Sequence, residues 1–100
     1  MSLELNNFRG QRAKEILENE EFQAAFEAIK TELINQWEQS PLRDNEGREK
    51  IHQYLTMLNK VKAQITSVME TGRLAQLELD HKRNISQRAK DAIRQFSDPY

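Results

Sequence analysis

The sequence predicts an all-α fold: an antiparallel helical hairpin with a short N-terminal helix and a third, C-terminal helix, assembled into an oligomer. Between residues 51 and 68, apolar residues recur at alternating steps of three and four, as in a helix packing seam. The 100 residues include only 3 glycines and 2 prolines, too few for the frequent turns of sandwiches and barrels. A single domain of this length holds a modest core, so we expect self-association.

The N-terminal residues predict an arm followed by a short helix. Residues 1–10 contain apolar positions without a sustained period, and Gly10 weakens any helix that crosses it, so we expect a flexible arm. Residues 11–39 are expected to be helical, with a break near Asn19, which can cap the second helix. Because residues 18–21 contain no glycine or proline, one continuous helix through this point is the alternative.

The second helix, residues 20–39, carries a clean apolar stripe that predicts packing against the central helix. Its members fall within about 120° when wound at 100° per residue, and they are Phe22, Ala25, Phe26, Ile29, Leu33 and Trp37. Trp37 is interpreted as an anchor that closes the hairpin. Ile34 lies well off the stripe and is either an ordinary exposed residue or part of a contact between subunits, so it is a candidate partner-binding residue.

A turn at residues 40–45 is predicted to lead into a long central helix at residues 46–71. Pro41 disfavours helical geometry in Ser40, and Asp44 or Asn45 can cap the helix that follows. At 1.5 Å per residue the central helix would be roughly 39 Å long. Its seam consists of Ile51, Tyr54, Leu55, Leu58, Val61, Ile65 and Val68. Because the seam is too short for a parallel coiled coil and the opposite face is polar, an antiparallel hairpin is favoured.

The chain after Gly72 predicts a C-terminal helix at residues 73–96. Its apolar face consists of Leu74, Leu77, His81, Ile85, Ala89, Ala92 and Phe96, and Asp98-Pro99 is expected to end it. Gly72 is interpreted as a left-handed cap that ends the central helix and redirects the chain. The alternative is a flexible point within one very long helix.

The charge distribution is uneven although the net charge is only −1. Residues 1–49 carry a charge of −5 and residues 50–100 carry +4. This asymmetry favours antiparallel pairing of the two halves and also favours head-to-tail assembly. There is no cysteine, no cleavable signal pattern and no apolar run long enough to cross a bilayer, so we expect a cytosolic protein without a membrane partner.

No set of residues predicts catalysis, a metal site or a cofactor. Glu-x-x-His occurs twice, at Glu49–His52 and Glu78–His81, a spacing that di-iron bundles use in pairs. The first pair is expected to point away from the seam and the second to lie near the apolar face of its helix, so the two should not converge. The sequence also lacks a nucleophile elbow and a Gly-rich phosphate loop, so we expect no enzymatic activity.

A basic row on the C-terminal helix is the second candidate surface. Arg83, Lys90 and Arg94 lie on one stripe opposite the apolar face. Such a row suits phosphates or an acidic protein, and these three residues are candidate partner-binding residues. The alternative is an ordinary solvated helix face.

One stretch of sequence resembles a known group of proteins. The run Trp37-x-x-Ser40-Pro41-x-x-Asp44-x-Glu46-Gly47-Arg48-Glu49, followed by Gly72-Arg73-Leu74-Ala75, is similar to small helical proteins encoded by tailed bacteriophages and prophages. The resemblance covers roughly residues 22–79. It implies a protein that is made in the bacterial host cytoplasm and is connected with head or virion assembly. The virion is the second location that the resemblance implies.

These observations together predict a non-enzymatic structural or assembly protein that acts through helix–helix contacts. Its expected partners are copies of itself and other phage or host proteins. Two alternatives stay open: a nucleic-acid-binding accessory protein that uses the basic C-terminal helix, and a small inhibitor of a host protein.

Overall fold

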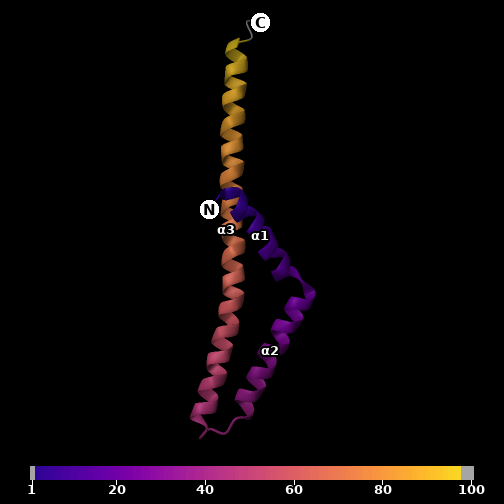
Figure 1. The fold of residues 1–100 in the computed structure, drawn as a ribbon, viewed down its shortest axis with the longest axis vertical. Helices are drawn as coiled ribbons and strands as arrows, with labels where there is room; N and C mark the ends of the chain where they lie inside the picture. The colour runs from indigo at the N-terminus through magenta and orange to yellow at the C-terminus, as the bar shows by residue number, and fades with distance from the viewer. Residues whose placement is uncertain (1, 98–100) are drawn as a thin grey trace.

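The protein is an elongated assembly of helices. The computed structural model describes residues 2–97, with the side chains of residues 2–95. It contains α1 (Leu3–Glu18), α2 (Glu20–Gln39) and α3 (Asn45–Ser97), and within the described residues there is no strand. The predicted all-α class is therefore confirmed. The molecule measures 86 × 24 × 18 Å, and α3 forms its spine (Figure 1).

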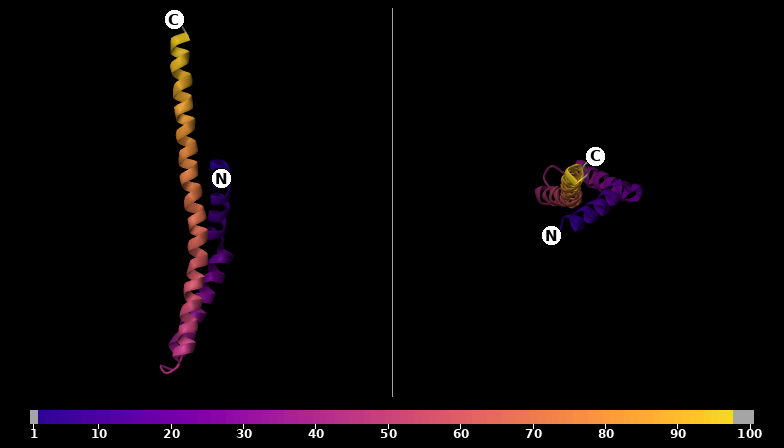
Figure 2. Two further views of the ribbon diagram at one scale, coloured as in Figure 1. Left: turned by 60° about the vertical axis from the view of Figure 1, so that its left-hand side comes forward. Right: turned by 90° about the horizontal axis from the view of Figure 1, so that it is seen from above.

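The three helices are arranged as a long rod with a shorter, bent arm beside it. α1 and α2 follow one another along the same direction, and α3 runs back in the opposite direction (Figure 1). α1 crosses α3 near the middle of the spine, and α2 lies beside its N-terminal part. Beyond the crossing, α3 continues without a neighbouring helix in every view (Figures 1 and 2).

The predicted flexible arm at residues 1–10 is wrong, because most of it is the first half of α1. Ser2 caps the helix, and its Oγ accepts a hydrogen bond from the backbone N–H of Leu5 at 3.1 Å. Gly10 does not break α1. It is buried against α3, so the packing gained there offsets the roughly 1 kcal/mol by which a glycine weakens a helix.

The predicted break at Asn19 is confirmed. Asn19 is both the C-cap of α1 and the N-cap of α2. Its Oδ1 accepts a hydrogen bond from the N–H of Phe22 at 2.9 Å. Its own N–H donates to the carbonyl of Ile16 at 3.2 Å. The side chain of Gln23 reaches back to the carbonyl of Leu17 at 2.8 Å, so the bend is held on both sides.

The predicted turn after residue 39 is also present, and Arg48 holds it. α2 ends at Gln39, and Asp44 Oδ1 caps α3 by accepting a hydrogen bond from the N–H of Gly47 at 3.0 Å. The Arg48 guanidinium donates to the carbonyls of Trp37 and Ser40, both at 3.3 Å, and to Ser40 Oγ at 2.9 Å. It also stacks 4.0 Å from the centre of the Trp37 ring. One side chain from α3 therefore satisfies the open C-terminal end of α2.

The predicted division into helices at residues 46–71 and 73–96 is wrong, because α3 is continuous from Asn45 to Ser97. Gly72 lies inside it, and none of the described glycines has a positive φ, so Gly72 is not a left-handed cap. The predicted stop at Asp98-Pro99 and the side chain of Phe96 lie outside the described residues.

The buried core is small. Among the described apolar side chains only Ala13, Phe26 and Ala75 are buried, and Gly10 and Gly72 are buried beside the two alanines. The predicted stripe of α2 is only partly covered: Phe26 is buried, but Ile29 and Trp37 are 51% and 43% exposed. On the facing helix, Val61 is 49% exposed. Within the predicted seam, Tyr54 and Val61 are therefore left in solvent, and the other five residues are only half-buried.

Candidate interaction surface

α1 and α3 cross in close contact at two glycines, Gly10 and Gly72. A Cβ added to Gly10 would lie 2.5 Å from the Cα of Gly72, and one added to Gly72 would lie 2.8 Å from the carbonyl oxygen of Asn6. Backbone therefore touches backbone at this point, which only glycine permits. Ala13 and Ala75, each three residues further along its helix, are buried beside the glycines. This crossing fixes the position of α1 along α3.

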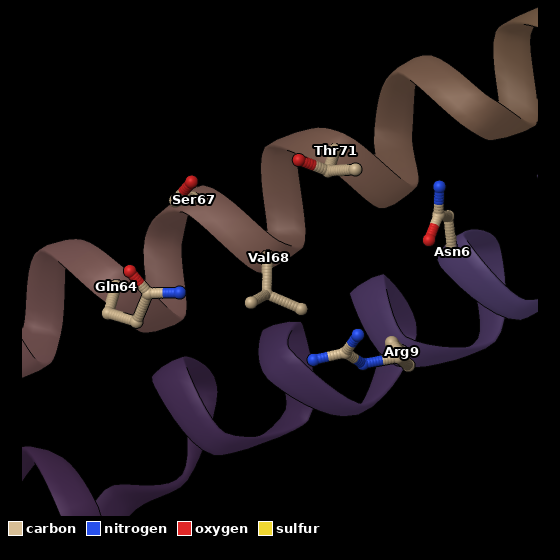
Figure 3. Close-up of a pocket in the computed structure, with 6 residues that line it drawn as sticks. All are labelled: Asn6, Arg9, Gln64, Ser67, Val68 and Thr71. Carbon is tan, nitrogen blue, oxygen red and sulfur yellow. The ribbon is translucent and has the colours of Figure 1, made fainter. Parts of the chain in front are cut away.

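A shallow pocket lies on one side of the crossing (Figure 3). Asn6 and Arg9 reach it from α1, and the remaining lining residues, Gln64, Ser67, Val68 and Thr71, come from α3. Val68 points from the spine toward α1 in this view. Apart from Val68 the lining is polar, but it includes no carboxylate or imidazole. The pocket offers hydrogen bonds and one guanidinium, without a group suited to proton transfer near neutral pH.

A solvent-exposed helical surface lies on the part of α3 beyond the crossing, residues 81–95, which we call the projecting segment. Every residue in it is exposed. It contains five bases, Lys82, Arg83, Arg88, Lys90 and Arg94, and one acid, Asp91, for a net charge of +4. It nevertheless carries apolar side chains, with Ile85 53% and Ile93 67% exposed. This basic part of α3 is therefore solvent-exposed along its described length in the single chain.

The structure places the four predicted partner-binding residues in two separate regions. Arg83, Lys90 and Arg94 are all in the projecting segment and all exposed. Ile34 is on α2, 38% exposed, where it lines a pocket with Trp37, His52 and Leu55. Because 31 residues of straight helix separate His52 from Arg83, the two regions are roughly 46 Å apart. They cannot form one site within a single chain.

A second exposed apolar surface lies at the other end of the rod, beside α2. Tyr54, Met57 and Val61 of α3 are 59%, 60% and 49% exposed and are spaced by three and four residues, so they form a row. Ile29 of α2 is 51% exposed. We call these four residues the α2–α3 flank. α2 itself carries five glutamates and one lysine, a net charge of −4.

The two Glu-x-x-His pairs are on the same helix and do not meet. Twenty-nine residues of α3 separate Glu49 from Glu78, a distance of roughly 44 Å along the helix. In the part of the chain that the structure describes, no three acids or histidines are grouped so that they could hold a metal ion. None of the helices between residues 2 and 97 has both the length and the apolar character needed to span a bilayer.

Two features of the surface were missed by sequence reasoning, although each has a signal. The three-four spacing of the seam continues after Val68 through Gly72, Ala75 and Leu79 without a change of step, which indicates a helix that does not stop at Gly72. Gly10-x-x-Ala13 repeats the small-residue spacing of Gly72-x-x-Ala75, which suits a close helix crossing. Nothing in the sequence pattern distinguishes Arg48 from other charged residues.

Comparison of the chain with models of protein families, with curated proteins and with solved structures gave no match.

Proposed function

We propose that this chain is a non-enzymatic structural protein that works by packing its long helix against further copies of itself. The observation that carries the proposal is the projecting segment, which is exposed at every position and still displays Ile85 and Ile93. The projecting segment extends a helix that is already formed, but it buries no face of its own, and most helices in proteins are stabilised by burying one face. A partner that covers this segment supplies that stabilisation.

The chain's chemistry supports an assembly role better than a catalytic one. The pocket at the crossing has no acid or histidine, and the two Glu-x-x-His pairs lie far apart on one helix. By contrast, large apolar side chains are exposed along the whole rod, from Phe8 at 58% to Tyr54 and Leu74 at 59% and 57%. Exposed apolar surface of this extent is typical of proteins that function in contact with others.

Sedimentation equilibrium at concentrations from low to high micromolar tests the proposal. We expect the average mass to rise above the monomer value of 11.8 kDa as the concentration increases, by mass action. A mass that stays at the monomer value throughout this range contradicts self-assembly.

The biological setting that we propose is bacteriophage head or virion assembly in a bacterial host, and it rests on the sequence resemblance around the turn. It is tested by looking for the chain in purified virions and by repeating the mass measurement with the other head proteins of the phage. Incorporation, or a complex with one of those proteins, supports the setting. Absence from the virion together with no complex contradicts it.

A second candidate function is nucleic-acid binding, and the net charge of +4 on the projecting segment favours it. Phosphate contacts release counterions, so true binding to duplex DNA weakens steeply as salt rises. Changing Arg83, Lys90 and Arg94 to Glu should leave the helical circular dichroism nearly intact and abolish this binding. Salt-insensitive or unchanged DNA binding in that variant would exclude the basic row as the contact.

A further inference from the structure

The two faces of the projecting segment have different chemistry, and this identifies which face needs a partner. Wound at about 100° per residue, Ile85, Ala89 and Ala92 lie within about 60° of one another. Lys82 and Arg88 lie about 60° to either side of Ile85, whereas Arg83 and Lys90 lie on the opposite side of the helix. The apolar row is therefore bordered by Lys82 and Arg88, and it is these two bases that a partner covering the row would meet.

The α2–α3 flank has the complementary composition. Ile34 and His52 line a pocket on one side of the α2–α3 contact. Ile29 is about 140° around α2 from Ile34, and Val61 is about 180° around α3 from His52, so both belong to the other side. Two glutamates of α2, Glu21 and Glu32, lie within about 80° of Ile29. On its α2 side the flank is thus an exposed apolar surface bordered by acids.

The flank and the projecting segment cannot meet within one molecule. Both Val61 and Ile85 lie on α3, which is one continuous helix, and the 24 residues between them span roughly 36 Å along it. Any contact between the two surfaces must therefore join different copies of the chain.

We propose that the projecting segment of one copy docks on the α2–α3 flank of a second copy. Ile85, Ala89 and Ala92 pack on Ile29 and Val61, while Lys82 and Arg88 face the glutamates of α2. The proposal rests on the self-assembly proposed above and names the surfaces that carry it.

Charge decides between this contact and the direct pairing of two projecting segments. Paired through their apolar rows, two such segments would bring Lys82 and Arg88 against the same two bases, whereas on α2 these bases meet Glu21 and Glu32. Like charges placed together at an interface are strongly unfavourable, and complementary charges raise the association rate and fix the register. The contact joins two different surfaces. If each copy docks its segment on the flank of a third copy, the result is a chain or ring; if two copies dock on each other, the result is a closed dimer.

A charge swap tests this contact. The segment variant combines Lys82→Glu with Arg88→Glu, and the flank variant combines Glu21→Lys with Glu32→Lys. Each variant alone places like charges across the contact, so we expect its association to weaken by about tenfold or more. In an equimolar mixture, the basic segment of one variant meets the acidic flank of the other, so we expect association to return. Sedimentation equilibrium measures all three samples.

The matched control is Arg83→Glu with Lys90→Glu, which makes the same change of charge on the opposite face of the segment. Charges that lie more than about 8 Å from the contact are largely screened at physiological salt, so this control should associate nearly as the wild type does. Thermal unfolding followed by circular dichroism should show that every variant remains helical. A segment variant that associates like the wild type overturns the proposal, as does a mixture that fails to recover.

The same experiment separates this proposal from the broader one. If the wild-type chain is monomeric at every concentration, self-assembly itself fails. If the wild type assembles but the control is disrupted as strongly as the segment variant, the docking face proposed here is wrong while self-assembly stands. A monomeric wild type that binds duplex DNA through Arg83 and Lys90 would replace both proposals with nucleic-acid binding.

Discussion

At the scale of single residues, two glycines and one arginine set the geometry of the rod. Gly10 and Gly72 let the backbones of α1 and α3 touch, and Arg48 joins the end of α2 to the start of α3. The glycines act through the absence of a side chain, and the arginine acts through hydrogen bonds to open carbonyls. These are different physical causes, and each makes a separate prediction.

Replacing Gly72 with Ala should destabilise the protein, although alanine favours helix formation. The added methyl group would lie 2.5 Å from Gly10 Cα and 2.8 Å from the Asn6 carbonyl, and backbone atoms cannot rotate away. We expect the free energy of unfolding to fall by about 1 to 2 kcal/mol. This is the cost of overpacking at the crossing minus the gain in helix propensity from replacing glycine with alanine. Urea denaturation at low protein concentration measures it. Ala63→Gly, at an exposed position of the same helix, calibrates the propensity. A gain in stability for Gly72→Ala would refute the close crossing.

Replacing Arg48 with Ala should loosen the turn by about 1 to 2 kcal/mol, because charged hydrogen bonds and a cation–π contact are lost together. Trp37 is the only tryptophan, so its fluorescence should shift toward that of a more solvated indole. Arg48→Lys keeps the charge but not the forked donors and should recover only part of the loss. Arg43→Ala, an exposed change in the same turn, is the control. Equal effects at positions 43 and 48 would contradict the clamp.

At the scale of helices, the break at Asn19 and the turn before α3 were predictable from local sequence, whereas the start of α1 at Leu3 and the continuity of the spine through Gly72 were predicted wrongly. Asn19, Pro41 and Asp44 end or begin helices through local hydrogen bonds and backbone restriction, so their neighbours in sequence suffice to predict them. Whether Gly10 and Gly72 interrupt a helix depends instead on what packs against them. That contact lies 62 residues away along the chain, and no local rule includes it.

Some features of the candidate surface were likewise predictable from the sequence and others were not. The basic row and the apolar row of the last helix were predictable, because both follow from helical winding alone. That residues 81–95 are all exposed and lie beyond the other described helices was not, since it follows from where α1 crosses the spine. The exposure of Tyr54 and Val61 was missed because both belong to the seam that α2 was expected to cover.

Replacing Asn19 with Ala should weaken the bend between α1 and α2. Its side chain caps α2, and removal of such a cap costs about 0.5 to 2 kcal/mol. Because no glycine or proline remains between residues 18 and 21, the two helices can then merge, and helicity should not fall. Asn35→Ala, at an exposed position inside α2, should be neutral or slightly stabilising. Loss of stability without loss of helicity, seen by circular dichroism during urea denaturation, is the expected result. A stability equal to the wild type would show that the cap is unimportant.

At the scale of the whole molecule, the rod is incomplete as a single chain. Its core is confined to the crossing and to Phe26, and α3 projects beyond the crossing for the whole of residues 81–95. A chain with this distribution of packing should be stable at the crossing and weak at the projecting end, because local stability follows the number of buried contacts. Association would remove that imbalance by covering the projecting end.

Hydrogen exchange of the backbone amides in residues 81–95, measured below and above the concentration at which copies associate, tests this account most directly. In the dilute sample we expect fast exchange in this segment and slower exchange around Gly72. In the concentrated sample we expect exchange in the segment to slow by about tenfold or more as a second copy covers it. Identical exchange in residues 81–95 at both concentrations, while the mass of the particle increases, would contradict the account.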